Sequence, residues 1–369
     1  MNVLSLFDGM SCGQIALERA GIKVDNYYAS EIDPYAIKIT MKNYPKTIQL
    51  GSITDWRTWD IPKPDLIIGG SPCQGFSFAG KGLNFDDPRS KLFLEFHDIL
   101  KHYKPKQFLL ENVIMSAQSN DVISSMLGDL YPECVGQKQL FKTGRLEPIM
   151  INSALVSAQF RERLYWTDIK DITQPIDKGI YLRDIVEKNV TTRGISDKLC
   201  KYIINKKGEP SHNLDRKSKV FTAGAHSGGS HSDMDLIPMR MKSKTLRSGE
   251  FTSKPEDRQE WNNIPFRCKQ VGEADISGNE YTRRVYSPDG KMRCLNAGGG
   301  GNLEPKISED NITWRKLTVT ECERLQTVPD GYTEGVSNTR RYHALGNGWT
   351  VDVIKHIFSF LPKEYKYAL

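Results

Sequence analysis

Apolar runs of strand length alternate with helical patterns over the first 170 residues of the chain. The runs lie at 3–7, 27–29, 66–68 and 108–110. Apolar residues recur at helical spacing over 11–20 and 92–100, and a further helix is predicted to begin at Asp33-Pro34, because proline suits a first helical turn. Strands separated by helices are typical of a parallel sheet covered on both faces.

The pattern changes between about 177 and 312. Helical periodicity is poor there, and the stretch holds 14 of the 30 glycines, notably at 224–229 and 298–301. Its aromatic residues indicate some core: Phe221, Trp261, Phe266, Tyr281 and Tyr286. We expect a smaller loop- and strand-rich lobe, although such a composition is also typical of partly disordered chain. Helical patterning returns at 318–325 and 350–360.

Composition narrows the class of protein. The 369 residues are 38% hydrophobic and 26% charged, as in soluble globular proteins. The sequence predicts neither a membrane span nor a signal peptide. Seven scattered cysteines without a CxxC pair argue against a disulfide framework or zinc site and suit a reducing cytoplasm. The net charge of +6 comes almost entirely from 177–312, with 24 Lys and Arg against 19 Asp and Glu, which alone indicates only a solvated surface.

Two segments near the N-terminus suit a nucleotide-like ligand. A turn of sequence Phe-Asp-Gly-Met-Ser-Cys-Gly, at 7–13, joins the first strand to the first helix, where a ligand can approach backbone amides. Glu31 follows the second strand, and a carboxylate there can accept from both hydroxyls of a ribose. Taken singly, each is equally typical of an ordinary turn or a solvated acid.

The segment after the third strand, Gly-Gly-Ser-Pro-Cys-Gln-Gly-Phe-Ser at 69–77, is more specific. It places Cys73 at the carboxyl edge of the sheet, where α/β proteins bind ligands. A lone cysteine is usually a small buried side chain, whereas one in a polar, glycine-containing loop at this edge is a candidate nucleophile.

Three further residues are candidates for the same site. Glu111 ends the adjacent strand and suits an acid that engages a ring nitrogen. Arg161 and Arg163 alternate along a predicted strand, so they would share one face and donate to a carbonyl or phosphate. Alone, this pair is also compatible with a surface strand carrying salt bridges.

In this order and spacing, the motifs resemble the cytosine-5 DNA methyltransferase family over about 1–170 and 280–365. The most specific signs are Pro72-Cys73-Gln74, Glu111-Asn112-Val113 and Gln159-x-Arg161-x-Arg163, with further matches at 315–322, 326–332 and 344–347. The tract 286–301 is similar to bacterial and phage members. Ser71, 156–158 and Trp349 are more similar to the animal de novo enzymes.

The resemblance implies an α/β fold. The sheet would be mixed, mostly parallel and Rossmann-like, with helices on both faces, as in S-adenosylmethionine-dependent methyltransferases. A discontinuous catalytic domain would comprise 1–176 and 313–369, and 177–312 would form an inserted target-recognition domain. The positive charge of that insert would then neutralise DNA phosphates.

The resemblance also implies a mechanism. Cys73 would add to C6 of a cytosine flipped out of the duplex. Glu111 would engage N3 and the exocyclic amine, Arg163 would bond O2, and Arg161 would position the Cys73 loop and the base. S-adenosyl-L-methionine would supply the methyl group for C5, and a mobile loop over 74–90 would close on the base. The loop and DNA contacts would be Gln74, Ser77, Lys81, Arg89 and Gln159.

Cofactor contacts carry over from the family to both ends of the chain. They are Phe7, Asp8, Gly9, Met10, Ser11, Gly13, Glu31, Ile32, Ser52, Ile53, Pro72, Asn347 and Trp349. Many relatives have aspartate after the residue equivalent to Gly51, so Ser52 or Asp55 is expected to meet the adenine amine. Many have Ser-Val where this chain has Gly348-Trp349, so Trp349 is expected to pack near the cofactor.

Alternatives remain open at this stage. A transfer RNA methyltransferase of the same family would use the same chemistry. A non-catalytic DNA-binding paralogue would be expected to lose Cys73, Glu111 or the arginines, and a small-molecule methyltransferase would not need the basic insert. We therefore expect a monomer on double-stranded DNA, without a membrane partner, in a bacterial or phage-infected host cytoplasm and associated with the nucleoid. A cognate restriction endonuclease is a candidate partner.

Overall fold

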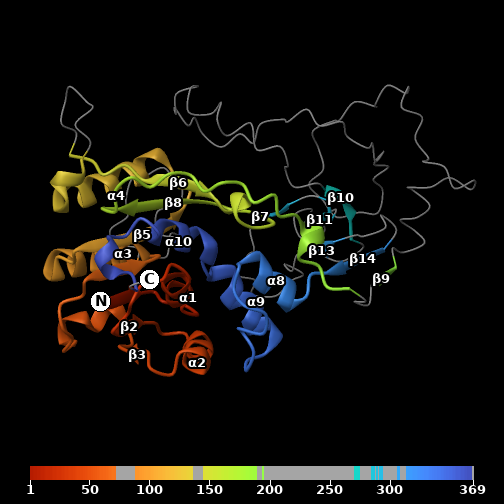
Figure 1. Ribbon diagram of the computed structural model, residues 1–369, viewed down its shortest axis with the longest axis horizontal. Helices are drawn as coiled ribbons and strands as arrows, with labels where there is room; N and C mark the ends of the chain where they lie inside the picture. The colour runs from red at the N-terminus through yellow and green to blue at the C-terminus, as the bar shows by residue number, and fades with distance from the viewer. Residues whose placement is uncertain are drawn as a thin grey trace, which may run out of the picture.

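The computed structural model describes residues 1–71, 88–135, 144–188, 193–194, 270–274, 284–286, 288–289, 291–293, 306–307 and 313–367. A seven-stranded sheet in the order β3-β2-β1-β4-β5-β8-β6 forms its centre (Figure 1). Its strands are β1 (Asn2–Leu6), β2 (Asn26–Ser30), β3 (Ile48–Gln49), β4 (Leu66–Gly69), β5 (Gln107–Val113), β6 (Ile149–Asn152) and β8 (Glu162–Thr167). β1 to β5 run parallel, whereas β8 is antiparallel to both β5 and β6. The predicted mixed, mostly parallel sheet is confirmed.

Helices cover both faces of this sheet. They are α1 (Cys12–Arg19), α2 (Pro34–Asn43), α3 (Pro88–Tyr103), α4 (Ala117–Leu130) and α10 (Val351–Phe358). Two further helices, α8 (Val319–Leu325) and α9 (Asn338–Asn347), lie at one end of the sheet. Short 3-10 turns lie at η1 (Ile53–Thr58), η2 (Pro132–Cys134), η3 (Ser153–Leu155), η4 (Leu182–Asp184) and η6 (Lys363–Tyr365). Among the described residues, every helix is too short or too polar to span a bilayer.

The alternation of side chains along the strands explains the two covered faces. Val3 packs in one core with residues of α1 and α10, and the next residue, Leu4, packs in a second core with α3, α4 and η1. Because successive strand residues point to opposite faces, a strand that is apolar throughout is buried on both sides.

Residues near the two termini pack together. α10 lies beside α1, where Arg19 pairs with Asp352 at 3.0 Å. The backbone N–H of Lys23 donates to the carbonyl of Tyr365 at 2.8 Å. The C-terminal segment thus contributes to the same core as β1.

A second sheet lies at the other end of the molecule, with α8 and α9 between it and the first (Figure 1). Its strands, in spatial order, are β10 (Gln270–Glu273), β11 (Arg284–Tyr286), β13 (Lys306–Ile307), β14 (Thr313–Lys316) and β9 (Arg193–Gly194). Separately, β12 (Met292–Arg293) pairs with β7 (Gln159–Phe160).

The division of the chain into domains at 177 and 312 stays a prediction. Near each boundary, described residues on one side contact residues on the other side. Leu182 is buried in the core that holds α1 and α10. Lys291, also fully buried, donates to the carbonyls of Ala154 at 2.7 Å and Ile180 at 2.8 Å. β14, just beyond the second boundary, belongs to the second sheet.

Candidate active site

Several predicted site residues lie outside the described part of the chain. These are Pro72, Cys73, Gln74, Ser77 and Lys81. Arg89 lies in the first turn of α3. The structure describes this part of the chain up to Ser71, two residues before the predicted nucleophile.

The turn after β1 is shaped by left-handed backbone conformations. Phe7, Gly9 and Ser11 have φ angles of 58°, 58° and 59°. The N–H of Gly9 donates to Glu31 Oε2 at 2.8 Å, and Glu31 Oε1 accepts from the amides of Ile32 at 2.7 Å and Asp33 at 2.8 Å. Three amides therefore fix the Glu31 carboxylate beside the turn, as a ribose-binding acid requires.

Asp8 forms the inner side of the same turn. Its carboxylate accepts from Tyr27 Oη at 2.8 Å and from the Ser11 hydroxyl. Desolvation raises the pKa of Asp8 to about 6, although the hydroxyl donors oppose that shift. Burial also raises the pKa of the Cys12 thiol to about 12, so this cysteine is poorly suited to act as a nucleophile.

The adenine side of the predicted cofactor site lies beyond Glu31. Ile32 is 74% exposed, which is unusual for a large apolar side chain and leaves its surface open to a flat ring. Ile53 is buried at the start of η1. Ser52 caps η1 through a hydrogen bond from the Thr54 amide at 3.3 Å, and Asp55 accepts from the Thr54 hydroxyl at 3.3 Å. Both candidates for the adenine contact thus lie on one short turn.

Gly13 and Met10 are packing residues of this turn. A Cβ at Gly13 would lie 2.5 Å from Ile68 Cδ1 and 2.9 Å from Tyr27 Oη, so glycine lets α1 approach the sheet. The Met10 side chain is 1% exposed. A Cβ at Gly348 would lie 2.7 Å from Met10 Cε, so Gly348 packs closely against the turn after β1. The predicted cofactor contacts Asn347 and Trp349 are the residues immediately before and after this glycine.

Glu111 occupies the centre of the second predicted cluster. It lies on β5 and is 8% exposed. Arg163 Nε, from β8, contacts Glu111 Oε1 at 3.0 Å. A Cβ at Gly70 would lie 3.0 Å from Glu111 Oε2, and Asn112 Nδ2 donates to the carbonyl of Ser71 at 3.3 Å. The end of β4, which leads to Cys73, therefore adjoins Glu111.

The prediction of one strand through both arginines is wrong. Arg161 lies between β7 and β8, because its backbone N–H donates to Asn152 Oδ1 at 3.2 Å and its carbonyl accepts from the amide of Ser153 at 2.9 Å. Its guanidinium is buried and donates to the carbonyls of Gly346 at 3.2 Å and Gly348 at 3.1 Å. Arg161 thus holds the C-terminal segment, while Arg163 contacts Glu111 directly.

The structure adds to what the sequence predicted for two residues, Trp349 and Gln159. Trp349 Nε1 donates to Glu111 Oε2 at 3.2 Å, although Trp349 was expected only near the cofactor. Gln159 is fully buried, and neither polar atom of its amide has a hydrogen-bond partner among the described residues. Its position in the Gln-x-Arg-x-Arg motif was the sequence signal for a functional role.

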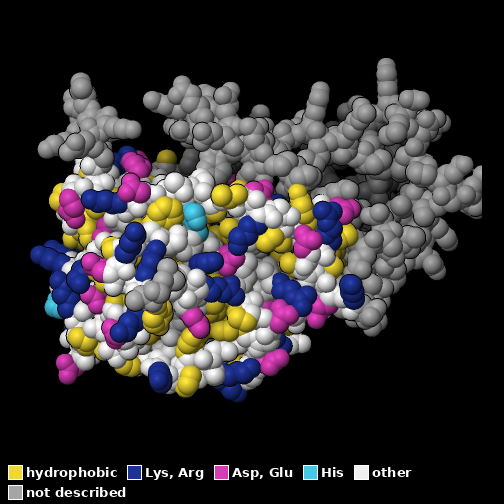
Figure 2. Space-filling view, viewed as in Figure 1, with side chains coloured by type: hydrophobic (Ala, Val, Ile, Leu, Met, Phe, Trp, Pro, Cys, Tyr) yellow, Lys and Arg dark blue, Asp and Glu magenta, His cyan; other side chains and the backbone are white. Residues whose placement is uncertain are grey.

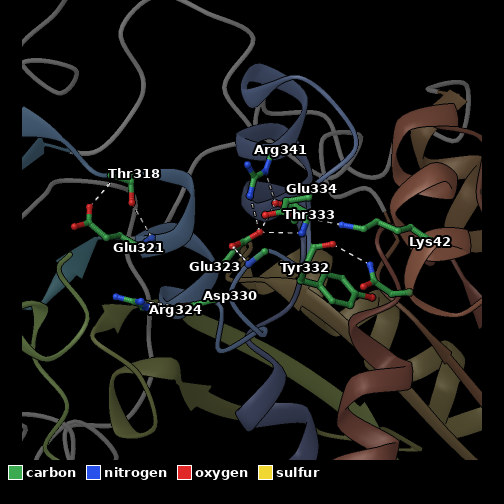
Figure 3. A network of polar contacts seen from close by, with 12 residues as sticks. Lys42, Thr318, Glu321, Glu323, Arg324, Asp330, Tyr332, Thr333, Glu334 and Arg341 are labelled. Atoms are coloured by element: carbon green, nitrogen blue, oxygen red, sulfur yellow. Dashed lines mark hydrogen bonds and ion pairs between the residues drawn. The ribbon is translucent and has the colours of Figure 1, made fainter. Parts of the chain in front are cut away.

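The turn after β1 is also contacted by the loop that follows α8, and the buried carboxylate of Glu323, in α8, holds that loop (Figure 3). Glu323 is fully buried and accepts from the amides of Gly331 and Thr333, both at 2.8 Å, and from Arg341 at 3.1 Å. Tyr332 in this loop donates its hydroxyl to the carbonyl of Met10 at 2.7 Å. Sequence reasoning missed this support, because nothing in a helical pattern marks Glu323 as buried.

The described surface carries no concentrated positive patch on the face seen in Figure 2. Lys and Arg side chains there are interspersed with Asp and Glu. The described residues also contain no cluster of three or more His, Cys, Asp or Glu placed to hold a metal ion. Most of the positively charged stretch 177–312 lies outside the described residues.

The chain is similar in sequence to methyltransferases of Bacillus phages. The chain is 27% identical over 362 residues to the orphan methyltransferase M.Rho11sI of Bacillus phage rho11s, covering 85% of this chain and 70% of the relative. It is 25% identical over 458 residues to M.SPBetaI of Bacillus phage SPbeta, covering 99% and 98%.

Solved structures share the fold. One is described as a DNA modification methyltransferase encoded within an E. coli prophage, with a TM-score of 0.57, 21% identity and 98% of both chains covered. Another is the Dnmt2 methyltransferase of S. pombe, with a TM-score of 0.56, 16% identity and both chains fully covered at 100%. The sequence profile described as C-5 cytosine-specific DNA methylase matches residues 1–363. The protein therefore belongs to the C-5 cytosine-specific DNA methylase family.

Proposed function

We propose that this protein transfers a methyl group from S-adenosyl-L-methionine to C5 of a cytosine that it flips out of duplex DNA. The observation that carries this proposal is the convergence on Glu111 of Arg163, Trp349 and the end of β4. A buried, hydrogen-bonded carboxylate next to the Cys73 segment is the arrangement that activation of a pyrimidine ring requires.

The residues around Glu31 fit the proposed cofactor. A carboxylate held by the amides of Gly9, Ile32 and Asp33 keeps one lone pair, on Oε2, for a ribose hydroxyl. The exposed Ile32 offers an apolar face for adenine. When bound, S-adenosyl-L-methionine supplies an electrophilic methyl group on a positively charged sulfur.

The chain's own residues account for the remaining chemistry. The Cys73 thiolate would form a bond to C6, which moves electron density toward C5. Glu111 would engage N3 and the exocyclic amine, and Arg163 would donate to O2, so both stabilise the charge that develops on the ring. After C5 is methylated, a base removes the C5 proton, the C5–C6 double bond re-forms and the C6–sulfur bond breaks to release Cys73.

Relatives of this chain include both orphan and type II methyltransferases. Family membership is therefore compatible with a paired restriction endonuclease and with a solitary enzyme. We infer double-stranded DNA as the substrate, because the family is defined by DNA methylation. A monomer on DNA in the bacterial or phage-infected cytoplasm remains our expectation.

The proposal is tested by replacing the nucleophile. We expect Cys73→Ala to abolish transfer from labelled S-adenosyl-L-methionine to DNA while cofactor binding survives, because the thiolate forms the bond to the base but is not needed to hold the cofactor. Cys134→Ala is the matched control, since Cys134 is a free, half-buried cysteine at the end of η2, and we expect it to keep full activity.

Undiminished transfer by Cys73→Ala would remove Cys73 from the mechanism. Labelling of transfer RNA with no labelling of DNA by the unmodified protein would assign the alternative substrate. Bisulfite sequencing of DNA from cells that express the protein would then identify the methylated site.

A further inference from the structure

Both oxygens of the Glu111 carboxylate are engaged, each by a donor from a different part of the chain. Arg163 Nε contacts Oε1 at 3.0 Å, and Trp349 Nε1 donates to Oε2 at 3.2 Å. We propose that Trp349 is a positioning residue for Glu111, in addition to any contact it makes with the cofactor. The inference rests on the proposed function, because it assigns Trp349 to the acid that engages the target base.

The surroundings of Trp349 leave its indole little freedom. A Cβ at Gly70 would lie 3.0 Å from Trp349 Nε1, so glycine at the end of β4 makes room for the ring. A Cβ at Gly13 would lie 3.7 Å from Trp349 Cζ3. The half-buried ring therefore lies between the first turn of α1 and the end of β4, with its polar edge toward Glu111.

The backbone on both sides of Trp349 is anchored in the core. The carbonyl of Gly348 accepts from Arg161 Nη2 at 3.1 Å and from Gln326 Nε2 at 3.2 Å. The hydroxyl of Thr350 donates to Gln326 Oε1 at 2.9 Å. Arg161, Gln326 and Thr350 are all buried, so the indole is presented from a rigid support.

This arrangement determines how Glu111 can meet a base. A carboxylate held at one oxygen can rotate about its terminal torsion, which is broad and only weakly restrained. Donors at both oxygens fix its plane, and each oxygen keeps a lone pair for the substrate. Because orientation governs the chemical step, loss of the indole N–H should slow chemistry more than it weakens binding.

The first test is Trp349→Phe, which keeps an aromatic ring and removes the donor. We expect the single-turnover rate of methyl transfer to fall roughly tenfold, as loss of a hydrogen bond to a charged group predicts. The dissociation constants for S-adenosyl-L-methionine and DNA should change less than about threefold, because the donor orients Glu111 rather than binding either ligand.

Trp56→Phe is the matched control. Trp56 Nε1 donates to Glu95 Oε2 at 2.7 Å, so this variant removes the same kind of bond in the core that contains η1 and α3. We expect its single-turnover rate to match the unmodified enzyme. An unchanged rate with a weakened cofactor affinity in Trp349→Phe would overturn the proposal and make Trp349 a cofactor contact alone.

A double-mutant cycle with Glu111→Gln shows whether Trp349 acts through Glu111. We expect Trp349→Phe to cost markedly less in the Glu111→Gln background than in the unmodified enzyme, because the residue that it positions has already lost its acid function. If the rate loss of the double variant equalled the product of the two single losses, Trp349 would act independently of Glu111 and the proposal would fail.

The contact itself can be tested without any activity. The indole 15N–1H resonance of Trp349, assigned by its absence in Trp349→Phe, should shift upfield in Glu111→Ala, whereas the Trp56 indole should not move. An unmoved Trp349 resonance would contradict the proposal. If the unmodified protein labels neither DNA nor RNA, the proposed function fails, while this spectrum still decides whether Trp349 holds Glu111.

Discussion

The two halves of the candidate site are built in different ways. On the cofactor side, Glu31 is fixed by Gly9, Ile32 and Asp33, all within 22 residues along the chain. On the base side, Glu111 is fixed by Arg163 and by Trp349, which is 238 residues away in the sequence. The first half is local, whereas the second exists only after the C-terminal segment has packed against the sheet.

The two halves of the site therefore depend on different parts of the fold. The amides that hold Glu31 come from the turn after β1 and from the two residues that follow Glu31, although Tyr332 also donates to the Met10 carbonyl of that turn. Long-range contacts require the ordering of several segments at once, and each loses conformational entropy when it packs. Damage to the packing of the C-terminal segment should therefore affect the base side before it affects the cofactor side.

The largest expected effect follows from removing the buried support of the base side. Arg161→Met deletes the donors to Gly346 and Gly348. We expect the free energy of unfolding to fall by about 3 kcal/mol, because buried carbonyls lose charged donors. Single-turnover methyl transfer should fall roughly 100-fold, since Trp349 and Glu111 lose their fixed geometry.

Arg161→Lys is the control, because lysine keeps the positive charge but cannot donate from two nitrogens to both carbonyls. We expect it to lose less stability and less activity than Arg161→Met. Urea unfolding and single-turnover kinetics measure the two effects. If Arg161→Met weakened cofactor binding as strongly as it slowed chemistry, the separation between the two halves would be wrong.

A smaller effect is expected from the pH dependence of the cofactor side. Desolvation raises the pKa of Asp8 from 3.8 to about 6, so the folded state binds this proton more tightly than the unfolded chain. The stability it contributes is fully present below about pH 4 and is lost as pH rises through about 6. Because Asp8 is partly exposed, the total change should stay under about 3 kcal/mol.

Asp8→Asn should therefore flatten the stability profile between pH 4 and 7. Part of the slope should remain, because burial also raises the pKa of Asp168, which directly follows β8, to about 6. Urea unfolding at several pH values checks this. An identical slope in the variant would exclude Asp8 as the titrating group.

The smallest expected effect concerns the cofactor side alone. Glu31→Gln replaces one carboxylate oxygen with an NH2 group, which cannot accept from a backbone amide, so either the bond from Gly9 or the bonds from Ile32 and Asp33 are lost. We expect the dissociation constant for S-adenosyl-L-methionine to rise about tenfold, which corresponds to one weakened charged hydrogen bond. The rate at saturating cofactor should hardly change, because the base side is built separately.

Isothermal titration calorimetry and single-turnover kinetics separate these two quantities. A loss of rate at saturating cofactor that exceeded the loss of affinity would show that the two halves are coupled through the sheet.

Four strands of the sheet, β1, β2, β4 and β5, were predictable because each has a run of apolar residues at its centre, whereas β3 and β6 were not predicted. α4 was not predicted, since Ser119, Asn120 and Ser124 interrupt its apolar pattern. Ser124 is buried there and accepts from Trp166 Nε1 at 2.9 Å. Likewise, the interruption at Arg161 depends on Asn152, whose side chain takes the hydrogen bond that a continuous strand would use.

The fold class, the family and the place of Glu31 after the second strand follow from periodicity and motif order in the sequence, whereas Glu111, expected just after its strand, lies within β5, which pairs with β8 as far as Val113. Tertiary structure alone decided that Arg161 supports the C-terminal segment and that Trp349 donates to Glu111. The physical reason is the separation along the chain of the residues that interact. Periodicity and turn preferences act between near neighbours, whereas a hydrogen bond between residues 111 and 349 depends on how separate layers of the molecule pack.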